Sequence, residues 1–356
     1  MKIAVLAGDG IGPEVMKEAL KVLDKVGEVF GHEFEYLKGV IGGDAWEKRG
    51  EYFPDETKKV CEQADAILFG SVGGPVSEQS NEKWRNCEKE SILGLRKYFD
   101  FNINLRPVRI YEALKEKCVL KDEIIKDGVD ILCVRELSSG IYFGEHKTED
   151  IDGERKASDV MEYDEITIEK VARRAFEAAM KRSKKVSSVD KANVLDCSKL
   201  WREVVSEVAK DYPECELEHV LVDNCVMQVL KRPSDFDVLL LPNMFGDIVS
   251  DEISVFAGSL GMLPSASLNR DGFGMYEPSG GSAPDIAGKG IANPIAQILS
   301  VAMMLKHSFS LDEESEAIVE AVEKALNKGY KTVDISNEDS VSTSRMGTLI
   351  SEFITR

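Results

Sequence analysis

Short apolar runs that alternate with amphipathic stretches restrict the fold of this 356-residue chain more than any other feature. An apolar run at residues 2–8 ends in glycine, and residues 13–30 follow with apolar side chains at helical spacing. Further strand-like runs occur at residues 65–69, 131–134 and 238–241, with helix-like stretches at 168–180 and 201–208. Strands that alternate with helices in this way predict an α/β protein with a largely parallel sheet.

The length of the chain exceeds the size at which a single hydrophobic core usually keeps growing, so we expect two lobes. The C-terminal part is predicted to be mainly helical, at residues 294–307, 313–326 and 344–354. No linker rich in proline or serine and no internal repeat divides the sequence. We therefore expect two lobes that the chain crosses more than once, with a cleft between them.

The composition disfavours several classes of partner. A formal net charge of -19 argues against nucleic acid and anionic membrane surfaces, since no basic run is present that could release phosphate counterions. The apolar start at residues 1–6 is too short for a secretion signal or a membrane span. We expect a cytoplasmic enzyme in which an anionic ligand meets locally placed arginines.

Two aspartates, Asp247 and Asp251, stand four residues apart in the segment GDIVSDEIS. On a helix that begins near Gly246 both carboxylates would share one face, about 6 Å apart along the axis, which suits one hard divalent cation. Acidic side chains are also common at solvated helix starts, where they complement the dipole, and in enzymes that bind diphosphates. The pair alone therefore names no reaction.

Three arginines, Arg96, Arg106 and Arg135, lie within or at the ends of apolar stretches, where a guanidinium can bind a carboxylate through two hydrogen bonds. Each alone could be a surface residue, but together with the aspartates they predict a substrate with two carboxylates. Tyr142 and Lys191 flank strand-like segments. Tyrosine can deliver a proton to carbon and lysine can act as a base, although a packed aromatic and a surface cation are the simpler interpretations.

The glycines at positions 8, 10 and 12 in GDGIGPE lack the G-x-G-x-x-G spacing of a Rossmann dinucleotide site, so we discount such a site there. A better candidate is EPSGGSAPDIAGKGIANP at residues 277–294, whose small residues allow a ligand to approach the backbone closely. Asp285 in this segment could bind both hydroxyls of a ribose.

Seven segments that together span nearly the whole chain resemble the isocitrate/isopropylmalate dehydrogenase family. They are GDGIGPEV at 8–15, GSVGGP at 70–75, LRK and NLRP between 95 and 107, VREL and GIYFGE between 134 and 145, VDKANVL at 189–195, NMFGDIVSDEISVFAGSLGMLPSAS at 243–267, and GSAPDIAGKGIANP at 281–294. The segment around the two aspartates is long and specific to this family. Chance agreement over all seven segments is negligible.

The resemblance implies NAD-dependent oxidative decarboxylation of a small β-carboxylated 2-hydroxy acid, with Mg²⁺ or Mn²⁺. The substrate that the resemblance favours is 3-isopropylmalate, which gives 2-oxoisocaproate (4-methyl-2-oxopentanoate) and CO₂ in leucine biosynthesis. Homoisocitrate, isocitrate, tartrate and malate are the alternative substrates. A non-catalytic regulatory subunit is a third interpretation, but such subunits typically lack part of the tyrosine, lysine and aspartate set, which is complete here.

The resemblance also assigns roles to single residues. Lys191 would help to remove the hydroxyl proton as hydride passes to NAD, and Tyr142 would protonate the enolate that remains after CO₂ departs. The residues implied to contact the substrate are Arg96, Arg106, Arg135, Asp223 and Ile92. The implied metal ligands are Asp247 and Asp251 with Asp223 of the partner subunit. The implied cofactor-binding residues are Gly281, Ser282, Ala283, Asp285, Ile286 and Asn293.

The family fold is an open α/β sheet in two lobes with a dinucleotide site that is not of the Rossmann type. By the resemblance, residues 1–101 and 258–356 form lobe one with the cofactor loops. Residues 102–257 form lobe two with the metal and substrate residues and the dimer interface. The implied assembly is a homodimer with shared active sites.

Two positions depart from the usual family pattern. Ser279 and Gly280 replace a common Val-His pair, so a histidine contact to the cofactor is not expected. Ser91 stands where many members have glycine or alanine, which keeps substrates with a polar substituent open. The acidic residue expected near the nicotinamide is either Glu88 or Glu90.

Overall fold

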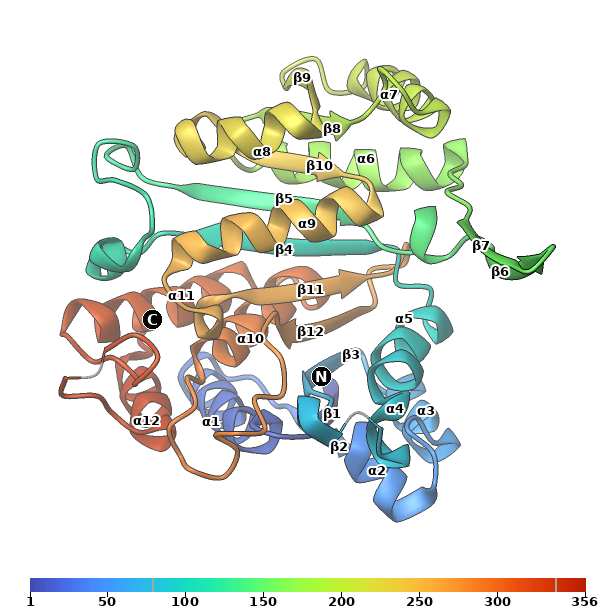
Figure 1. Ribbon diagram of the computed structural model, residues 1–356. Helices are drawn as coiled ribbons and strands as arrows, with labels where there is room; N and C mark the ends of the chain where they lie inside the picture. The colour runs from blue at the N-terminus through green and yellow to red at the C-terminus, as the bar shows by residue number, and fades with distance from the viewer. Residues whose placement is uncertain (79, 337) are drawn as a thin grey trace. The chain divides into compact units, whose positions relative to one another are not determined.

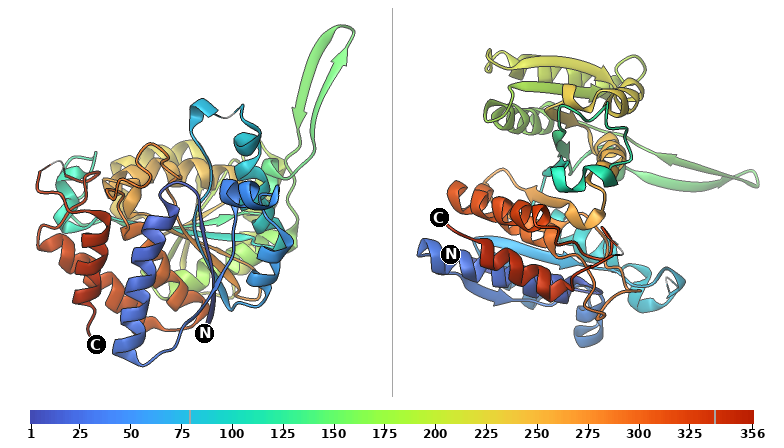
Figure 2. Two further views of the ribbon diagram at one scale, coloured as in Figure 1. Left: turned by 90° about the horizontal axis from the view of Figure 1, so that it is seen from below. Right: turned by 90° about the vertical axis from the view of Figure 1, so that its left-hand side faces the viewer.

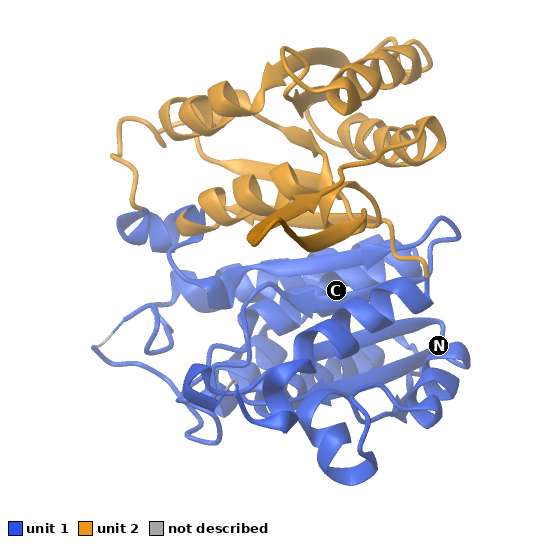
Figure 3. Cartoon of the chain, turned by 45° about the vertical axis from the view of Figure 1, so that its right-hand side comes forward, with its two compact units in different colours: residues 1–99, 110–118, 256–356 blue, residues 100–109, 119–255 orange. Residues whose placement is uncertain are grey.

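The computed structural model describes residues 1–78, 80–336 and 338–356, which divide into two compact units (Figure 3). Unit 1 comprises residues 1–99, 110–118 and 256–356, and unit 2 comprises residues 100–109 and 119–255. Residues 110–118 lie within the range that the sequence assigned to lobe two. They belong to unit 1 because the 3₁₀ turn at Glu112–Lys117 contacts helix α11 (Asp312–Asn327).

The described residues of unit 1 form five strands in the order β2-β1-β3-β12-β11 (Figure 1). The strands are β1 (Lys2–Gly8), β2 (Glu35–Lys38), β3 (Ala66–Ser71), β11 (Pro264–Leu268) and β12 (Gly274–Pro278). All neighbours run parallel except β11 and β12, which form an antiparallel pair. Every residue of β3 is buried, as expected for a central strand with both faces covered.

Helices α1 and α10 pack on these strands, and α11 and α12 pack in turn on α1 and α10. The helices of unit 1 are α1 (Gly12–Phe30), α2 (Gly42–Arg49), α3 (Asp55–Glu62), α4 (Glu82–Arg85), α5 (Gly94–Tyr98), α10 (Ile295–Ser308), α11 (Asp312–Asn327) and α12 (Thr343–Phe353). The apolar stripe of α1 forms because Val15, Ala19 and Val22 recur on one face and are all at most 2% exposed. Gly31, in the left-handed conformation, ends this helix.

The sheet of unit 2 has five strands in the order β4-β5-β10-β8-β9. The strands are β4 (Ile103–Arg109), β5 (Asp130–Glu136), β8 (Lys185–Asp190), β9 (Glu216–Leu221) and β10 (Val238–Leu241). Strands β5, β10, β8 and β9 run parallel, and β4 pairs antiparallel with β5. Two contacting helix pairs cover this sheet: α6 (Glu165–Met180) with α7 (Asp196–Ala209), and α8 (Val222–Lys231) with α9 (Asn243–Ser254).

A separate hairpin of strands β6 (His146–Ile151) and β7 (Glu154–Asp159) extends away from the rest of unit 2 (Figure 2). Asp152 and Gly153 both have positive φ at its turn, which is the conformation that an Asp-Gly pair favours in a two-residue hairpin loop. All residues of both strands are exposed. An isolated hairpin of this kind is only marginally stable in water, so these strands need additional packing.

The largely parallel α/β architecture expected from the alternation of strands and helices is confirmed in both units. The antiparallel pair β11–β12 and the hairpin β6–β7 were not expected from the sequence. None of the helices in the described ranges is long and apolar enough to cross a membrane.

Candidate active site

Several side chains of the candidate site in unit 2 lie at or just after the carboxyl ends of parallel strands. Arg135 is the penultimate residue of β5, Asn243 follows β10 by one residue, and Lys191 directly follows β8. Open α/β sheets bind their ligands at this edge, because loops from several strands meet there. Strand order alone therefore gathers side chains that are far apart in the sequence.

Helix α9 presents Asp247 and Asp251 to two arginines. Asp247 Oδ1 accepts a hydrogen bond from Arg135 Nη1 at 2.5 Å and lies 3.8 Å from Arg106 Nη1. Asp251 Oδ1 accepts from Arg106 Nη1 at 3.3 Å, and Ser250 Oγ lies 2.8 Å from the same nitrogen. All of these side chains except Ser250 were expected to share the site, and unit 2 brings the four together, with α9 beginning at Asn243 rather than near Gly246.

Arg135 is 4% exposed and is held against the start of α9. Its Nε and Nη2 both donate to Asn243 Oδ1, at 3.2 and 2.8 Å. A Cβ on Gly246 would lie only 2.6 Å from Cγ of Arg135, so glycine is required for this close approach. The remaining Nη1 faces Asp247.

Arg106 projects from β4, where it lies opposite Cys133 of β5. Its Nε is buried without a partner among the described residues, while its Nη1 contacts the acidic face of α9. A buried guanidinium nitrogen with no acceptor is costly, so a further acceptor is expected to meet it when ligand is bound.

The phenol of Tyr142 lies beside the same carboxylate. Its hydroxyl donates to Asp247 Oδ2 at 3.2 Å, its ring faces the Arg135 guanidinium at 6.0 Å, and the residue is 45% exposed. Burial raises the pKa of Tyr142, and the negative charge of Asp247 raises it further. The phenol therefore carries its proton at neutral pH, as a proton donor must.

Lys191 and Asp223 form a separate ion pair. Lys191 Nζ donates to Asp223 Oδ1 at 2.5 Å, and this hydrogen bond holds the pKa of the Asp223 carboxyl below its usual range. Within the described part of the chain, no three acidic, histidine or cysteine residues lie close enough to hold one metal ion. Asp223 is thus not grouped with Asp247 and Asp251 in a single chain.

Unit 1 holds the third arginine. Arg96 in α5 donates from Nη2 to Glu277 Oε1 at 3.0 Å, and Glu277, in β12, is 5% exposed. The Nε of Arg96 is buried without a partner in the described ranges, as in Arg106. Sequence reasoning did not identify Glu277, although it begins the glycine-rich segment at 277–294.

Ser91 is fully buried, and its hydroxyl donates a hydrogen bond to the backbone carbonyl of Cys87 four residues earlier. The interpretation in which Ser91 faces a substrate is therefore wrong for this structure. Ile92 is half-buried. A π-helical turn at Lys89–Leu93 precedes α5, so Ile92 and Arg96 are not on one continuous α-helix, and such turns are frequent at functional sites.

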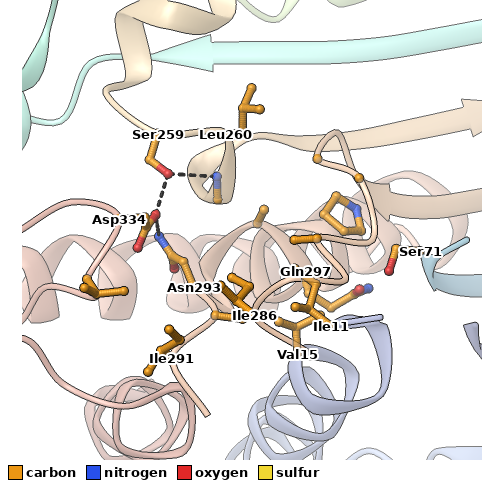
Figure 4. Close-up of a pocket in the computed structure, with 18 residues that line it drawn as sticks. Ile11, Val15, Ser71, Ser259, Leu260, Ile286, Ile291, Asn293, Gln297 and Asp334 are labelled. Atoms are coloured by element: carbon orange, nitrogen blue, oxygen red, sulfur yellow. Dashed lines mark hydrogen bonds between the residues drawn. The ribbon is translucent and has the colours of Figure 1, made fainter. Parts of the chain in front are cut away.

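The glycine-rich segment lines a cavity of about 230 Å³ in unit 1 (Figure 4). Of the expected cofactor residues, Gly281, Ala283, Ile286 and Asn293 line it. Ser282 is buried behind them, and Asp285 is exposed outside the lining.

A residue that the sequence did not indicate organises one side of this cavity. Asp334 accepts hydrogen bonds from the Ser259 hydroxyl and from Asn293 Nδ2, the latter at 3.1 Å (Figure 4). Gln297 donates to the Phe69 carbonyl at 3.0 Å, whereas its own Oε1 is buried without a partner among the described residues. An unused acceptor in the lining suits a ligand that carries a hydrogen-bond donor.

The GDGIGPE loop packs against the glycine-rich segment at residues 277–294. The N–H of Ile11 donates to the Ser282 carbonyl at 2.8 Å, and a Cβ on Gly10 would lie 2.0 Å from that oxygen. Gly10 therefore allows close packing of the two backbones. Glu88 lies near the same segment, since a Cβ on Gly73 would be 3.1 Å from its Oε1 and 3.6 Å from Ser282 Oγ.

Comparison with known proteins gives the class of this chain. The family model described as isocitrate/isopropylmalate dehydrogenase matches residues 2–350, and the chain belongs to this family. An isocitrate dehydrogenase structure from Methylococcus capsulatus superposes with a TM-score of 0.87 at 32% identity, covering 100% of this chain and 99% of that one.

Individual relatives agree in sequence over almost their whole length. A 3-isopropylmalate dehydrogenase from Haemophilus influenzae is 57% identical, over 99% of both chains. One from Thermotoga maritima is 54% identical, over 98% of both chains. The chain is thus a dehydrogenase of this family.

Proposed function

We propose that this chain oxidises and decarboxylates 3-isopropylmalate with NAD, giving 2-oxoisocaproate and CO₂ as a cytoplasmic step of leucine biosynthesis. The observation that carries the proposal is the group in unit 2 where Tyr142, Arg135 and Arg106 surround Asp247. This group combines two arginines that can bind a dicarboxylate, a phenol that carries its proton, and a carboxylate that can bind a metal ion. The names of the two relatives at 57% and 54% identity favour isopropylmalate among the family substrates.

The donor set fits a hard divalent cation, because it consists of carboxylate oxygens and Asp251 is largely exposed. We assign Asp247 and Asp251, with Asp223 of the partner subunit, as ligands of Mg²⁺ or Mn²⁺. When bound, such an ion stabilises negative charge that develops on the oxygen at C2 of the substrate. The neighbouring arginines hold these carboxylates in place.

The cavity of unit 1 fits one end of a dinucleotide. Its lining is largely apolar, a Cβ on Gly281 would meet nothing within 4 Å, and the unused Gln297 Oε1 offers an acceptor. NAD, when bound, accepts the hydride from C2 of the substrate. No lysine or arginine follows Asp285 before Lys289. Its carboxylate would therefore repel the 2′-phosphate of NADP and favour NAD.

The roles of the remaining residues follow from their chemistry. The Nε atoms of Arg96 and Arg106 are buried without a partner among the described residues, and we assign these two arginines, with Arg135, to the substrate carboxylates. Lys191, as the neutral amine, takes the hydroxyl proton, and Asp223 pairs with the ammonium group that results. Tyr142 delivers a proton to C3 after CO₂ has left.

We further propose a homodimer in which each site uses both chains. Asp223, Met227 and Leu230 share one face of α8, and Ile248 and Asp251 share one face of α9, which Val255 directly follows. The four apolar side chains among these residues are between 37% and 56% exposed. A second copy that covers these faces would bring its Asp223 toward Asp251, and Lys191 would move with Asp223 because the two are paired.

The test is turnover by the purified protein with NAD, Mg²⁺ and a panel of 2-hydroxy acids. We expect 2-oxoisocaproate from 3-isopropylmalate, loss of activity with chelator, and recovery with Mg²⁺ or Mn²⁺. With NADP in place of NAD, kcat/KM should be at least about tenfold lower. Faster turnover of homoisocitrate, isocitrate, tartrate or malate would overturn the substrate assignment.

A further inference from the structure

Asn243, the first residue of α9, is 1% exposed, and its amide oxygen and amide nitrogen bind two different parts of unit 2. Its Oδ1 accepts from Nε and Nη2 of Arg135 at 3.2 and 2.8 Å. Its Nδ2 donates to the carbonyl of Ser139 at 2.8 Å, and its backbone N–H donates to the Tyr163 hydroxyl at 2.8 Å.

The contact with Arg135 fixes the plane of the guanidinium. Two of its three nitrogens converge on one amide oxygen, so the third, Nη1, is directed at Asp247. A long side chain held at two points has lost its rotamer freedom before ligand binds. Arg135 is therefore already oriented for a substrate carboxylate.

The contact with Ser139 fixes the loop that leads to Tyr142. The N–H of Ser139 donates to Glu136 Oε2 at 3.0 Å and its carbonyl accepts from Asn243, so its backbone is held on both sides. Gly140 has a positive φ and donates to the Glu162 carbonyl at 2.9 Å. Tyr142 follows two residues later.

We propose that Asn243 is a positioning residue that holds the Arg135 guanidinium and the Tyr142 loop in one fixed arrangement. An amide suits this place because it offers an acceptor to arginine and a donor to a carbonyl on the same side chain. The proposal rests on the proposed function, since it assigns Arg135 to substrate binding and Tyr142 to protonation.

The decisive variant is Asn243→Asp, which keeps an acceptor for Arg135 but cannot donate to Ser139. We expect kcat for isopropylmalate to fall about 10- to 100-fold, the scale of a slightly misplaced catalytic group, with KM nearly unchanged. Asn243→Ala removes both contacts and should raise KM as well. The matched control is Asn327→Asp, which adds the same charge at an exposed residue of α11.

A second experiment determines from which side the proton reaches C3 of the product. In D₂O the wild type should place deuterium at C3 of 2-oxoisocaproate in a single configuration, determined after immediate oxidation of the product with peroxide. Asn243→Asp should give mixed configuration, because protonation no longer depends on a fixed phenol. A purely structural role would lower the thermal midpoint without changing the stereochemistry.

Each outcome decides one question. An Asn243→Asp variant with normal kcat and one configuration overturns the positioning role, as does a variant that fails to fold, which would make Asn243 a folding residue. Absence of isopropylmalate turnover in the wild type instead overturns the proposed function. Equal effects in Asn327→Asp would show that added charge alone is responsible.

Discussion

At the scale of residues, each arginine assigned to the substrate already meets a carboxylate of its own chain. Arg96 contacts Glu277, Arg106 contacts Asp251, and Arg135 contacts Asp247. A partly buried guanidinium without a counter-charge is unfavourable, so these carboxylates stabilise the arginines before ligand binds.

The first prediction concerns the phenol. Tyr142→Phe removes only the hydroxyl that lies 3.2 Å from Asp247, so packing changes little. If Tyr142 is the proton donor, kcat should fall by about 10²-fold or more while KM changes little. Steady-state kinetics with 3-isopropylmalate measure both values. Full kcat with weakened affinity would move Tyr142 from catalysis to binding.

The second prediction concerns substrate choice at the π-helical turn. If half-buried Ile92 contacts the isopropyl group, Ile92→Ser should lower kcat/KM for isopropylmalate by about 10- to 200-fold, the value of roughly 1 to 3 kcal/mol of apolar contact. Ser91→Ala is the matched control, since the Ser91 hydroxyl bonds to the Cys87 carbonyl and should not affect specificity. Equal loss on isopropylmalate, isocitrate and malate would remove Ile92 from the pocket.

At the scale of elements, α8 and α9 each carry an acidic residue within an exposed apolar face. Met227 on α8 is 51% exposed and Ile248 on α9 is 56% exposed. In the proposed homodimer, these exposed apolar side chains contact the second copy. The metal ligands would then lie where two helix faces from different copies meet.

The third prediction tests these faces. Met227→Asp places a charge in the proposed interface and should raise the dimer dissociation constant by about 10²-fold or more, as for a central contact residue. Ile166→Asp is the matched control, because Ile166 is 66% exposed on α6, away from α8 and α9. Sedimentation velocity at several concentrations reports the dissociation constants. Equal values for both variants would rule out α8 as interface.

At the scale of the whole molecule, the Lys191–Asp223 pair has a consequence for assembly. The two residues are joined in one chain, and the described residues contain no complete metal-ligand group in that chain. If Asp223 completes the site of its neighbour, Lys191 must serve that neighbour too. Each site then takes its phenol from one chain and its base from the other.

The fourth prediction follows from this division. Hybrid dimers of Tyr142→Phe and Lys191→Met chains, purified through two different tags, have one site with both changes and one with neither. They should regain about half of wild-type activity, one intact site of two in a symmetric dimer. Hybrids of Tyr142→Phe with Asp247→Asn are the control and should stay inactive, because both changes lie in the same group. Inactive hybrids in the first case would show that Lys191 acts within its own chain.

The sequence predicted those elements whose apolar pattern is strong. The run at 238–241 is β10, and the helical spacing after residue 12 is α1. The strands β6 and β7 were missed because their side chains are mostly polar and all exposed, so no alternation marks them. The pair β11–β12 was missed because β11 is buried but built largely from small and polar residues.

By itself the sequence determined the fold class, the family and the residue types of the candidate site, because these depend on local periodicity and on contiguous motifs. Only the tertiary structure decided which carboxylate meets each arginine and that Asn243 joins Arg135 to the Tyr142 loop. Arg96 and Glu277 are 181 positions apart, and Arg135 and Asp247 are 112 apart. Contacts over such separations follow from strand order and helix packing, which no local pattern encodes.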